Sequence, residues 1–140
     1  MTKESFAISE APGQLVVTAR GQTGSELFAA TSAAYFSSVC SLSEVKARQA
    51  YELEREAESV EQLLVDWLND LVWVFSEQGV ACTEVQFSHW SPTNYRVTLL
   101  GEALDEARHA PRDIVTAASN DGLKLEASEG HWTVRVILLT

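Results

Sequence analysis

The sequence predicts an α+β fold in which two helices pack on one face of a mainly antiparallel sheet. Two segments repeat apolar residues at three- and four-residue steps, which is the spacing of an amphipathic helix. Several shorter segments alternate apolar and polar residues, as strands do, and turn-forming residues separate them. The chain has 140 residues, a length that is enough to bury a core without disulfides or structural metal. It contains no internal repeat or linker. We therefore expect a single domain over residues 1–140.

The N-terminal part predicts a pair of strands followed by a helix. Residues 6–8 and 15–20 are rich in apolar and β-branched side chains, and a Pro-Gly turn lies between them. Thr23 and Glu26 then have the spacing of a capping box, in which each side chain satisfies a backbone N–H at the helix start. Apolar residues then recur at helical spacing from Leu27 to Val39 and form one side of the predicted helix.

The second predicted helix covers residues 59–75 and is the most distinctive segment of the chain. Ser59 and Gln62 form another capping box, and Gly79 supplies a stop. Its apolar side chains form one wide stripe, made of Val60, Leu64, Trp67, Leu68, Leu71 and Phe75. Such a stripe has to pack against other elements, so we interpret the segment as a core helix.

The other predicted strands cover residues 45–53, 84–89, 95–99, 112–118, 123–126 and 131–139. The first of these is ambiguous, because the charged residues between positions 43 and 58 suit a solvated helix as well as a strand. A Ser-Pro-Thr-Asn turn joins the second and third strands into a hairpin. The last strand has the clearest alternation of apolar and polar residues.

Charge limits the classes of partner. The chain has 20 acidic and 10 basic side chains, which gives a net charge of −10. A field of this sign repels nucleic acid and anionic membranes, so we expect direct binding to neither. A protein with a basic surface, such as an RNA-processing enzyme, would instead be attracted.

Location and cysteine chemistry are predicted from the same composition. The longest apolar runs are shorter than the roughly 18 residues that span a bilayer, and residues 1–5 do not begin a signal peptide. We expect a cytoplasmic protein. Cys40 and Cys82 lack the CxxC spacing of zinc and redox motifs and are interpreted as buried free thiols.

No motif in the chain indicates catalysis. A G-x-S-x-G nucleophile motif is absent from the sequence, and so is a glycine-rich loop that would cradle phosphate. His89 and His131 are interpreted as structural residues of strands. We therefore predict a protein that is not an enzyme.

Two groups of charged residues are candidates for contact with a partner. Asp66 and Asp70 lie one helical turn apart, where their repulsion favours a nearby cation or basic partner, or exposure to solvent. Arg108, His109 and Arg112 make a small basic loop on an acidic chain. Such a loop can bind a partner or an anion, and its arginines can equally pair with nearby acids. The sequence leaves these alternatives open.

Four blocks of the sequence together resemble one protein family. The segment LLVDWLNDL at residues 63–71 is similar to the LLVEWLNEL-type helix of the archease family. The other blocks lie in the family's order at residues 21–28, 101–109 and 135–138, and they are similar to its helix start, its G-E…R-H loop and its closing strand. The resemblance covers nearly the whole chain. It implies an α+β sandwich and an accessory protein that activates RNA ligases of the tRNA-splicing (RtcB) type.

The resemblance also implies where a metal would be held. In archeases, acidic residues of an N-terminal D-H-T-A-D motif and an Asp just before the C-terminus hold a divalent cation. Here Glu10, Gln14 and Leu139 occupy the matching positions, and Asp121 stands where the family has histidine. An amide supplies only a neutral oxygen ligand and a leucine supplies none. We therefore expect no metal and no other cofactor, with calcium as the cation that a residual site would take.

The resulting hypothesis is a non-enzymatic archease-like activator that docks, without the family's metal, on an RNA ligase or another basic RNA-processing protein. The candidate contact residues are Glu10, Gln14, Asp66, Asp70, Arg108 and His109. An alternative is a metal-free scaffold or oligomeric interaction domain that retains only the archease fold and forms a homo-oligomer. A third hypothesis is a small-ligand-binding domain with a cleft beside the Arg108 loop.

Overall fold

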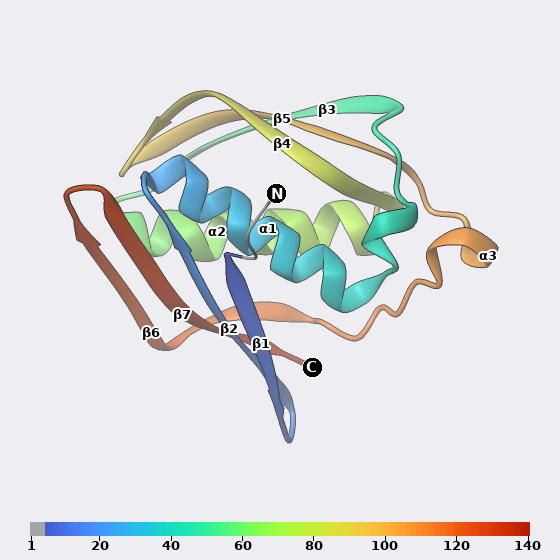
Figure 1. Cartoon of the computed structure of the whole chain (residues 1–140), viewed down its shortest axis with the longest axis horizontal. Helices are drawn as coiled ribbons and strands as arrows, with labels where there is room; N and C mark the ends of the chain where they lie inside the picture. The colour runs from blue at the N-terminus through green and yellow to red at the C-terminus, as the bar shows by residue number, and fades with distance from the viewer. Residues whose placement is uncertain (1–4) are drawn as a thin grey trace.

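Within residues 5–140, which the computed structural model describes, two antiparallel sheets enclose a layer of two long helices (Figure 1). The expectation of no N-terminal signal concerns residues 1–5, of which 1–4 lie outside the described residues. The strands are β1 (Phe6–Ala11), β2 (Gln14–Gly21), β3 (Gln49–Glu56), β4 (Val80–Ser91), β5 (Asn94–Ala103), β6 (Ala117–Ser128) and β7 (His131–Leu139). The helices are α1 (Gly24–Val39), α2 (Val60–Ser76) and the one-turn α3 (Glu106–His109), with a 3₁₀ turn at Leu42–Glu44.

The predicted α+β class and the antiparallel pairing of the strands are confirmed, and the layers are arranged differently from the expectation. The strands form a four-stranded sheet, in the order β1-β2-β7-β6, and a three-stranded sheet, in the order β3-β5-β4, where one sheet was expected. The two sheets cover α1 and α2 from opposite sides (Figure 1). α1 is suited to this position because 11 of its 16 residues are buried. The hydroxyls of Thr31 and Ser38 tolerate burial because they donate to the helix carbonyls of Phe28 and Ala34, at 2.7 and 2.8 Å.

Both long helices begin at the predicted caps. The Thr23 hydroxyl accepts the Glu26 N–H at 3.2 Å, and the Glu26 carboxylate accepts the N–H of the residue before Thr23 at 3.1 Å. The Ser59 hydroxyl accepts the Gln62 N–H at 3.1 Å. The prediction that the Gln62 side chain would also cap this helix is wrong, because its amide donates to Asp66 at 2.9 Å instead of accepting a backbone N–H at the helix start.

The apolar stripe of α2 faces a core shared by both helices and both sheets. Trp67 is fully buried, and its indole N–H donates to the carbonyl of Phe28 in α1 at 3.0 Å. Its ring centroid lies 5.4 Å from that of Phe87 in β4 and 5.3 Å from that of Tyr95 in β5. These aromatic contacts fix α2 against the three-stranded sheet, and the interpretation as a core helix is confirmed.

The ambiguous segment between positions 43 and 58 is a strand, but it begins later than predicted. Val45 is buried next to the 3₁₀ turn, outside β3. Pairing with β5 starts at Gln49, which lies opposite Gly101, and continues to Glu56. Tyr51 and Leu53 point toward the core, so the alternation that favoured a strand is correct and its start was placed four residues early.

The predicted strand at residues 112–118 is mostly wrong. Residues 112–116 form an irregular link, because the Arg112 N–H donates to the carbonyl of Val39 at the end of α1, at 2.6 Å, and not to a strand. β6 starts at Ala117 and also contains the predicted strand at 123–126. Its pairing with β7 is interrupted between Ser119 and Lys124.

Cys40 and Cys82 are buried and unpaired, as predicted. Burial raises the pKa of Cys40 to about 11 and the pKa of Cys82 to about 12, so both remain thiols at neutral pH. The helices in the described part of the chain are too short or too polar to cross a membrane.

Candidate functional site

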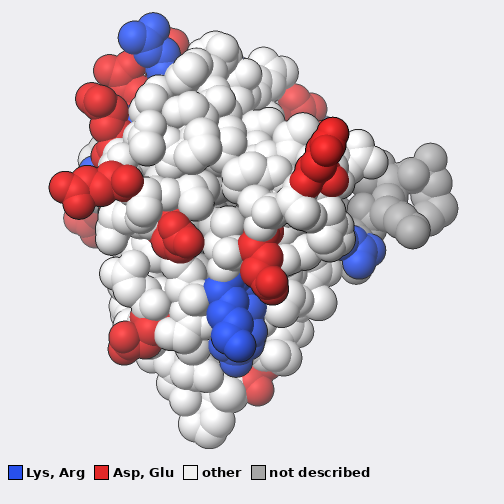
Figure 2. Space-filling view, turned by 90° about the vertical axis from the view of Figure 1, so that its left-hand side faces the viewer, with Lys and Arg blue, Asp and Glu red and all other residues white. Residues whose placement is uncertain are grey.

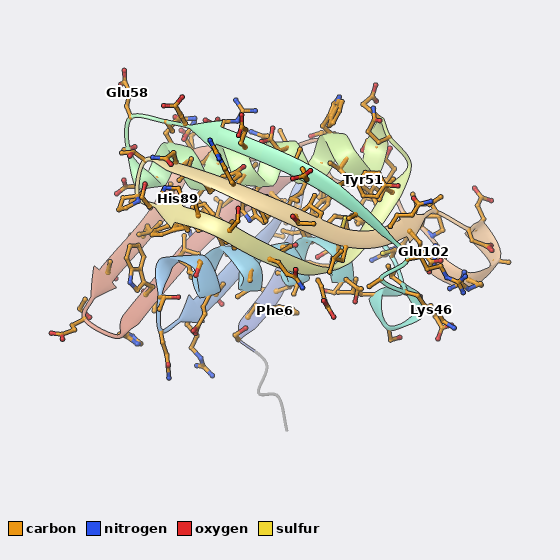
Figure 3. All side chains as sticks on the ribbon, turned by 90° about the horizontal axis from the view of Figure 1, so that it is seen from above. Phe6, Lys46, Tyr51, Glu58, His89 and Glu102 are labelled. Atoms are coloured by element: carbon orange, nitrogen blue, oxygen red, sulfur yellow. The ribbon has the colours of Figure 1, made fainter. Side chains whose placement is uncertain are left out.

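A buried carboxylate, Glu102 near the end of β5, is the centre of a polar cluster. Glu102 is only 5% exposed. It accepts the backbone N–H of Lys46 at 2.8 Å and two hydrogen bonds from the Arg108 guanidinium at 2.8 and 3.3 Å. The Arg48 Nε lies 3.3 Å from its Oε1. Figure 3 shows Glu102 and Lys46 together at one end of the three-stranded sheet, with His89 at the other end.

His109, the last residue of α3, is also part of this cluster. Its ring is fully buried, and Nε2 lies 3.1 Å from Oε2 of Glu102. The backbone N–H of Asp105 donates to Nδ1 at 2.9 Å, so Nδ1 is the acceptor and the proton resides on Nε2. The ring therefore donates to Glu102. The Asp105 carboxylate caps α3 by accepting the N–H groups of Ala107 and Arg108.

The close approach of β4 explains why a glycine, Gly101, precedes this glutamate. β4 passes so close to it that a Cβ atom at position 101 would lie 1.9 Å from the carbonyl oxygen of Ala81. The backbone carbonyl of Gly101 also accepts the Arg48 N–H at 2.9 Å. The Gly-Glu pair thus combines a close approach of two strands with an acceptor that holds the neighbouring loops.

The electrostatics of the cluster indicate a structural clamp. The hydrogen bonds from Arg108 and from the Lys46 N–H lower the pKa of Glu102 to about 2. Arg108 also donates to the carbonyl of Glu44 at 2.9 Å, and Arg112 donates to the carbonyl of Ser38 at 2.9 Å. Of the alternatives for the basic loop, internal pairing is therefore the one observed.

His109 has no exposed surface through which its ring could contact a partner, contrary to its selection as a contact residue. Arg108, the other candidate from this loop, is partly exposed but is held by Glu102. The three residues connect β5, the loop before β3 and α3, and their common role is to fix these segments to one another.

Asp66 and Asp70, for which the sequence left a basic partner or exposure to solvent open, differ in their contacts, and within residues 5–140 only Asp70 has a basic partner. Arg55 of β3 donates to both oxygens of Asp70, at 2.6 and 3.2 Å, and the Tyr95 hydroxyl donates to the same carboxylate at 3.2 Å. Asp66 accepts a hydrogen bond from the Gln62 amide. Both carboxylates remain partly exposed, so they can still contribute to a surface potential.

The positions that match the archease metal site are divided between the two faces of the four-stranded sheet. Gln14 is the register partner of exposed Leu139, on the outer face of the four-stranded sheet. Glu10 is the partner of buried Leu15, so its side chain belongs to the opposite face. Asp121 lies on β6, at the other edge of the sheet from β1.

The donor set at this end of the sheet fits a divalent cation poorly. Glu10 and Gln14 line a hollow of about 380 Å³ together with Arg112, whose positive charge opposes a cation. Glu10 supplies the carboxylate in the lining of this hollow. Among residues 5–140, no three His, Cys, Asp or Glu side chains come close enough together to hold a metal ion.

Trp73 is a surface residue that the sequence analysis did not select. It lies on α2 and is 50% exposed, which is unusual for a side chain of this size. Asp70 precedes it by one helical turn and Glu77 follows it by one turn, so it shares the acidic side of the helix. The signal was present in the sequence, because Trp73 falls outside the apolar stripe and within the acidic one.

These features define the class of protein: a small α+β sandwich with antiparallel sheets on both sides of a helical layer, and with a buried clamp of charged residues at one end. A model described as the archease protein family matches residues 6–138. The chain belongs to the archease family, and the resemblance of its four sequence blocks is confirmed.

Relatives and solved structures agree with this assignment. The chain is 25% identical over 121 residues to protein archease of Pyrococcus abyssi and 27% identical over 121 residues to that of Thermococcus gammatolerans, covering 84% of this chain and 85% of each relative. It resembles the solution structure of protein 1598 from Methanobacterium thermoautotrophicum with a TM-score of 0.79 at 22% identity, over 99% of this chain and 100% of that one. The crystal structure of an archease from Thermotoga maritima, named a possible chaperone, matches with a TM-score of 0.60 at 14% identity, over 94% of each chain. These names denote archeases and a possible chaperone, not enzymes, in agreement with the prediction of a non-enzymatic protein.

Proposed function

We propose that this chain is an accessory protein of an RNA ligase of the tRNA-splicing type and that it docks on the ligase through the surface around Trp73. Membership in the archease family supports an accessory role. The choice of an RNA ligase as the partner rests on the family resemblance of the sequence blocks. The observation that carries the docking surface is a half-exposed tryptophan on the side of α2 that also carries Asp70 and Glu77.

The surface has the composition of a binding centre for a basic protein. It consists of Trp73 with Asp66, Asp70, Glu77 and Asp113, and we call it the Trp73 surface. Asp113 joins it because its carboxylate accepts a hydrogen bond from the Ser76 hydroxyl of α2 at 2.7 Å. A tryptophan supplies a large apolar contact at low entropic cost, and such residues dominate the binding energy of many interfaces. The carboxylates would steer a basic partner toward Trp73. Lys or Arg groups of that partner would then stack on the indole ring.

The Trp73 surface is also held rigidly. The Asn69 carboxamide of α2 accepts the Ala118 N–H of β6 at 2.9 Å, and Arg55 of β3 fixes Asp70. The helix is therefore attached to both sheets on either side of the tryptophan. A preformed surface loses little conformational entropy when it binds.

The test is to purify the cognate ligase, measure its affinity for this protein, and measure multiple-turnover RNA joining with and without it. We expect saturable binding that weakens with salt, together with an increase in turnover. Trp73→Ala should weaken binding by about tenfold or more. His89→Ala is the control and should change binding by less than about twofold, because this exposed ring lies on β4 and not on α2.

Absence of both binding and turnover gain would exclude the ligase proposal. The alternative, an oligomeric interaction domain, predicts a different result in the same preparation. In that case sedimentation would show a homo-oligomer that Trp73→Ala dissociates, and the ligase would be unaffected.

We also propose that the accessory role does not use a bound calcium ion. The support is the poor donor set, with Leu139 at a ligand position of the family and Arg112 beside Glu10. Turnover of the ligase with this protein should therefore respond to added calcium no more than turnover of the ligase alone.

A further inference from the structure

Three basic side chains gather on the outer face of the four-stranded sheet. Arg20 lies on β2, Arg135 on β7 and Lys124 on β6, and all three are exposed. Figure 2 shows a group of Lys and Arg side chains in the lower half of the molecule, with acidic side chains beside it. On a chain with net charge −10, such a gathering of cations is unexpected.

These cations differ from the other arginines in their pairing. Arg48, Arg55, Arg96 and Arg108 each lie within 3.3 Å of a carboxylate oxygen. In the part of the chain from residue 5 onward, Arg20, Lys124 and Arg135 form no such ion pair. Within residues 5–140, their charges are therefore not neutralised by a paired carboxylate.

The strand register brings these cations together with two hydroxyl groups. Arg135 is paired with Thr18 on one side and with Lys124 on the other, and Arg20 is paired with Thr133. All five side chains line one hollow of about 540 Å³, and Glu126 lines it as well. Threonine hydroxyls between guanidinium and ammonium groups offer hydrogen-bond donors to an anion that the charges attract.

The arrangement is costly without an anion. Lys124 and Arg135 are direct register partners, and like charges in this position destabilise a sheet. Repulsion between these neighbouring cations fits a site that an anion completes.

We propose that this hollow, the β2-β7-β6 hollow, binds a phosphate monoester group. Two guanidinium groups match the oxygens of phosphate, which they bind through paired hydrogen bonds. A single compact phosphate fits better than a long polyanion, because Glu126 lies in the lining and the overall negative charge repels extended nucleic acid. The phosphate could belong to a free nucleotide or to the end of an RNA chain. This proposal is independent of the docking at the Trp73 surface, which lies on α2.

The test is titration of the full-length protein with inorganic phosphate at constant ionic strength, followed by amide NMR spectra. We expect saturable shifts confined to β2, β6 and β7 around Thr18 and Thr133. Arg135→Gln should weaken phosphate binding by about tenfold. Arg96→Gln removes the same charge from the outer face of the other sheet, where Arg96 pairs with Glu54, and should change it by less than about twofold. If Arg135→Gln does not fold, Lys124→Gln replaces it.

Two further ligands distinguish the sources of phosphate. Adenosine monophosphate that binds as well as phosphate would support a free nucleotide. An oligoribonucleotide that binds only when its end is phosphorylated would support an RNA end. The proposal is overturned if no saturable shifts occur, if Arg135→Gln and Arg96→Gln weaken binding equally, if oligonucleotides bind equally with and without the end phosphate, or if an acidic peptide shifts these amides and phosphate does not.

Discussion

Nε2 of His109 donates to a Glu102 oxygen 3.1 Å away, and its Nδ1 accepts the backbone N–H of Asp105. A neutral ring thus connects a strand carboxylate to the start of a one-turn helix. The remaining neighbours of that carboxylate, Arg108, Arg48 and the Lys46 N–H, are donors too. The Glu102 carboxylate is therefore the acceptor in every contact described around it. A substitution that places a donor at this position would leave these neighbours without an acceptor.

Glu102→Gln is expected to destabilise the fold strongly. The new amide NH₂ would face groups that can only donate, so it would lose hydrogen bonds and leave Arg108 without its charge partner. We expect the melting temperature to fall on the order of 10 °C. Glu54→Gln, which removes the same charge from an exposed pair with Arg96, should lower it by less than about 2 °C. Equal effects of the two variants in thermal unfolding would show that Glu102 is not a clamp.

The same carboxylate predicts a pH dependence. Its pKa is about 2 in the folded protein, whereas a glutamate in the unfolded chain has its ordinary pKa of 4.5. Because the folded pKa is depressed, Glu102 contributes stability above pH 4.5, and this contribution is lost as the pH falls from 4.5 toward 2. The difference in melting temperature between wild type and Glu102→Gln should therefore be constant from about pH 7 to about pH 5 and should narrow below that range. A difference that stays constant down to about pH 2.5 would contradict the prediction.

Arg55 and Asp70 are expected to be energetically coupled. The guanidinium donates to both carboxylate oxygens, and this bonding raises the pKa of Arg55. Because the Arg55 side chain is 42% exposed, we expect a coupling of about 1 kcal/mol or less. A double-mutant cycle with Arg55→Met and Asp70→Asn, read by urea unfolding, measures it. Tyr95→Phe should also lower the stability of the wild-type protein, because it removes the hydrogen bond to Asp70. Burial and Asp70 raise the pKa of the Tyr95 hydroxyl, so it stays protonated and keeps this bond. Strictly additive single-variant effects would indicate that the pair contributes nothing.

The parts of the fold that were predictable are those that depend on residues close together in the sequence. The Ser59 cap and the apolar stripe that includes Trp67 are properties of one continuous segment, and both long helices were found from such signals. The division into two sheets was not predictable, because it depends on both sides of α1 being buried. Ser38 looks like an exterior residue in the sequence, and only its hydrogen bond to the Ala34 carbonyl within the helix shows why it is inside.

The candidate site was predictable as a set of residues but not as a role. The block containing Gly101, Glu102, Arg108 and His109 was found from sequence, and its residues do come together. Their function as a buried clamp depends on burial, which polar residue types do not reveal. Arg55 was not anticipated as the partner of a helix carboxylate, because strand register places it there.

Gly101→Ala is expected to prevent stable folding. The added methyl would lie 1.9 Å from the Ala81 carbonyl oxygen and 2.7 Å from the Cα of Cys82, both backbone atoms that cannot move without separating β4 from β5. We expect loss of the cooperative unfolding transition, or a melting temperature lower on the order of 10 °C or more. Gly79→Ala is a useful comparison, because a Cβ there meets no atom within 4 Å and only its φ of +66° opposes the change. The reverse order of the two effects in thermal unfolding would show that close packing at Gly101 is not limiting.

Calcium is expected to leave the stability of this protein unchanged, and substitutions at two positions should make it responsive. Glu10 shares its hollow with Arg112, so the melting temperature should differ by less than about 1 °C between calcium and a chelator. Gln14 and Leu139 lie directly opposite each other on β2 and β7, at the distance where two carboxylates could share a cation. The combined Gln14→Asp and Leu139→Asp variant should be less stable than wild type without calcium and should gain several degrees with it. The matched control, Gln14→Asn with Leu139→Asn, has the same shape without the charge and should not respond. A calcium-dependent rise in the wild type that Glu10→Gln abolishes would instead show that the native site still holds the metal.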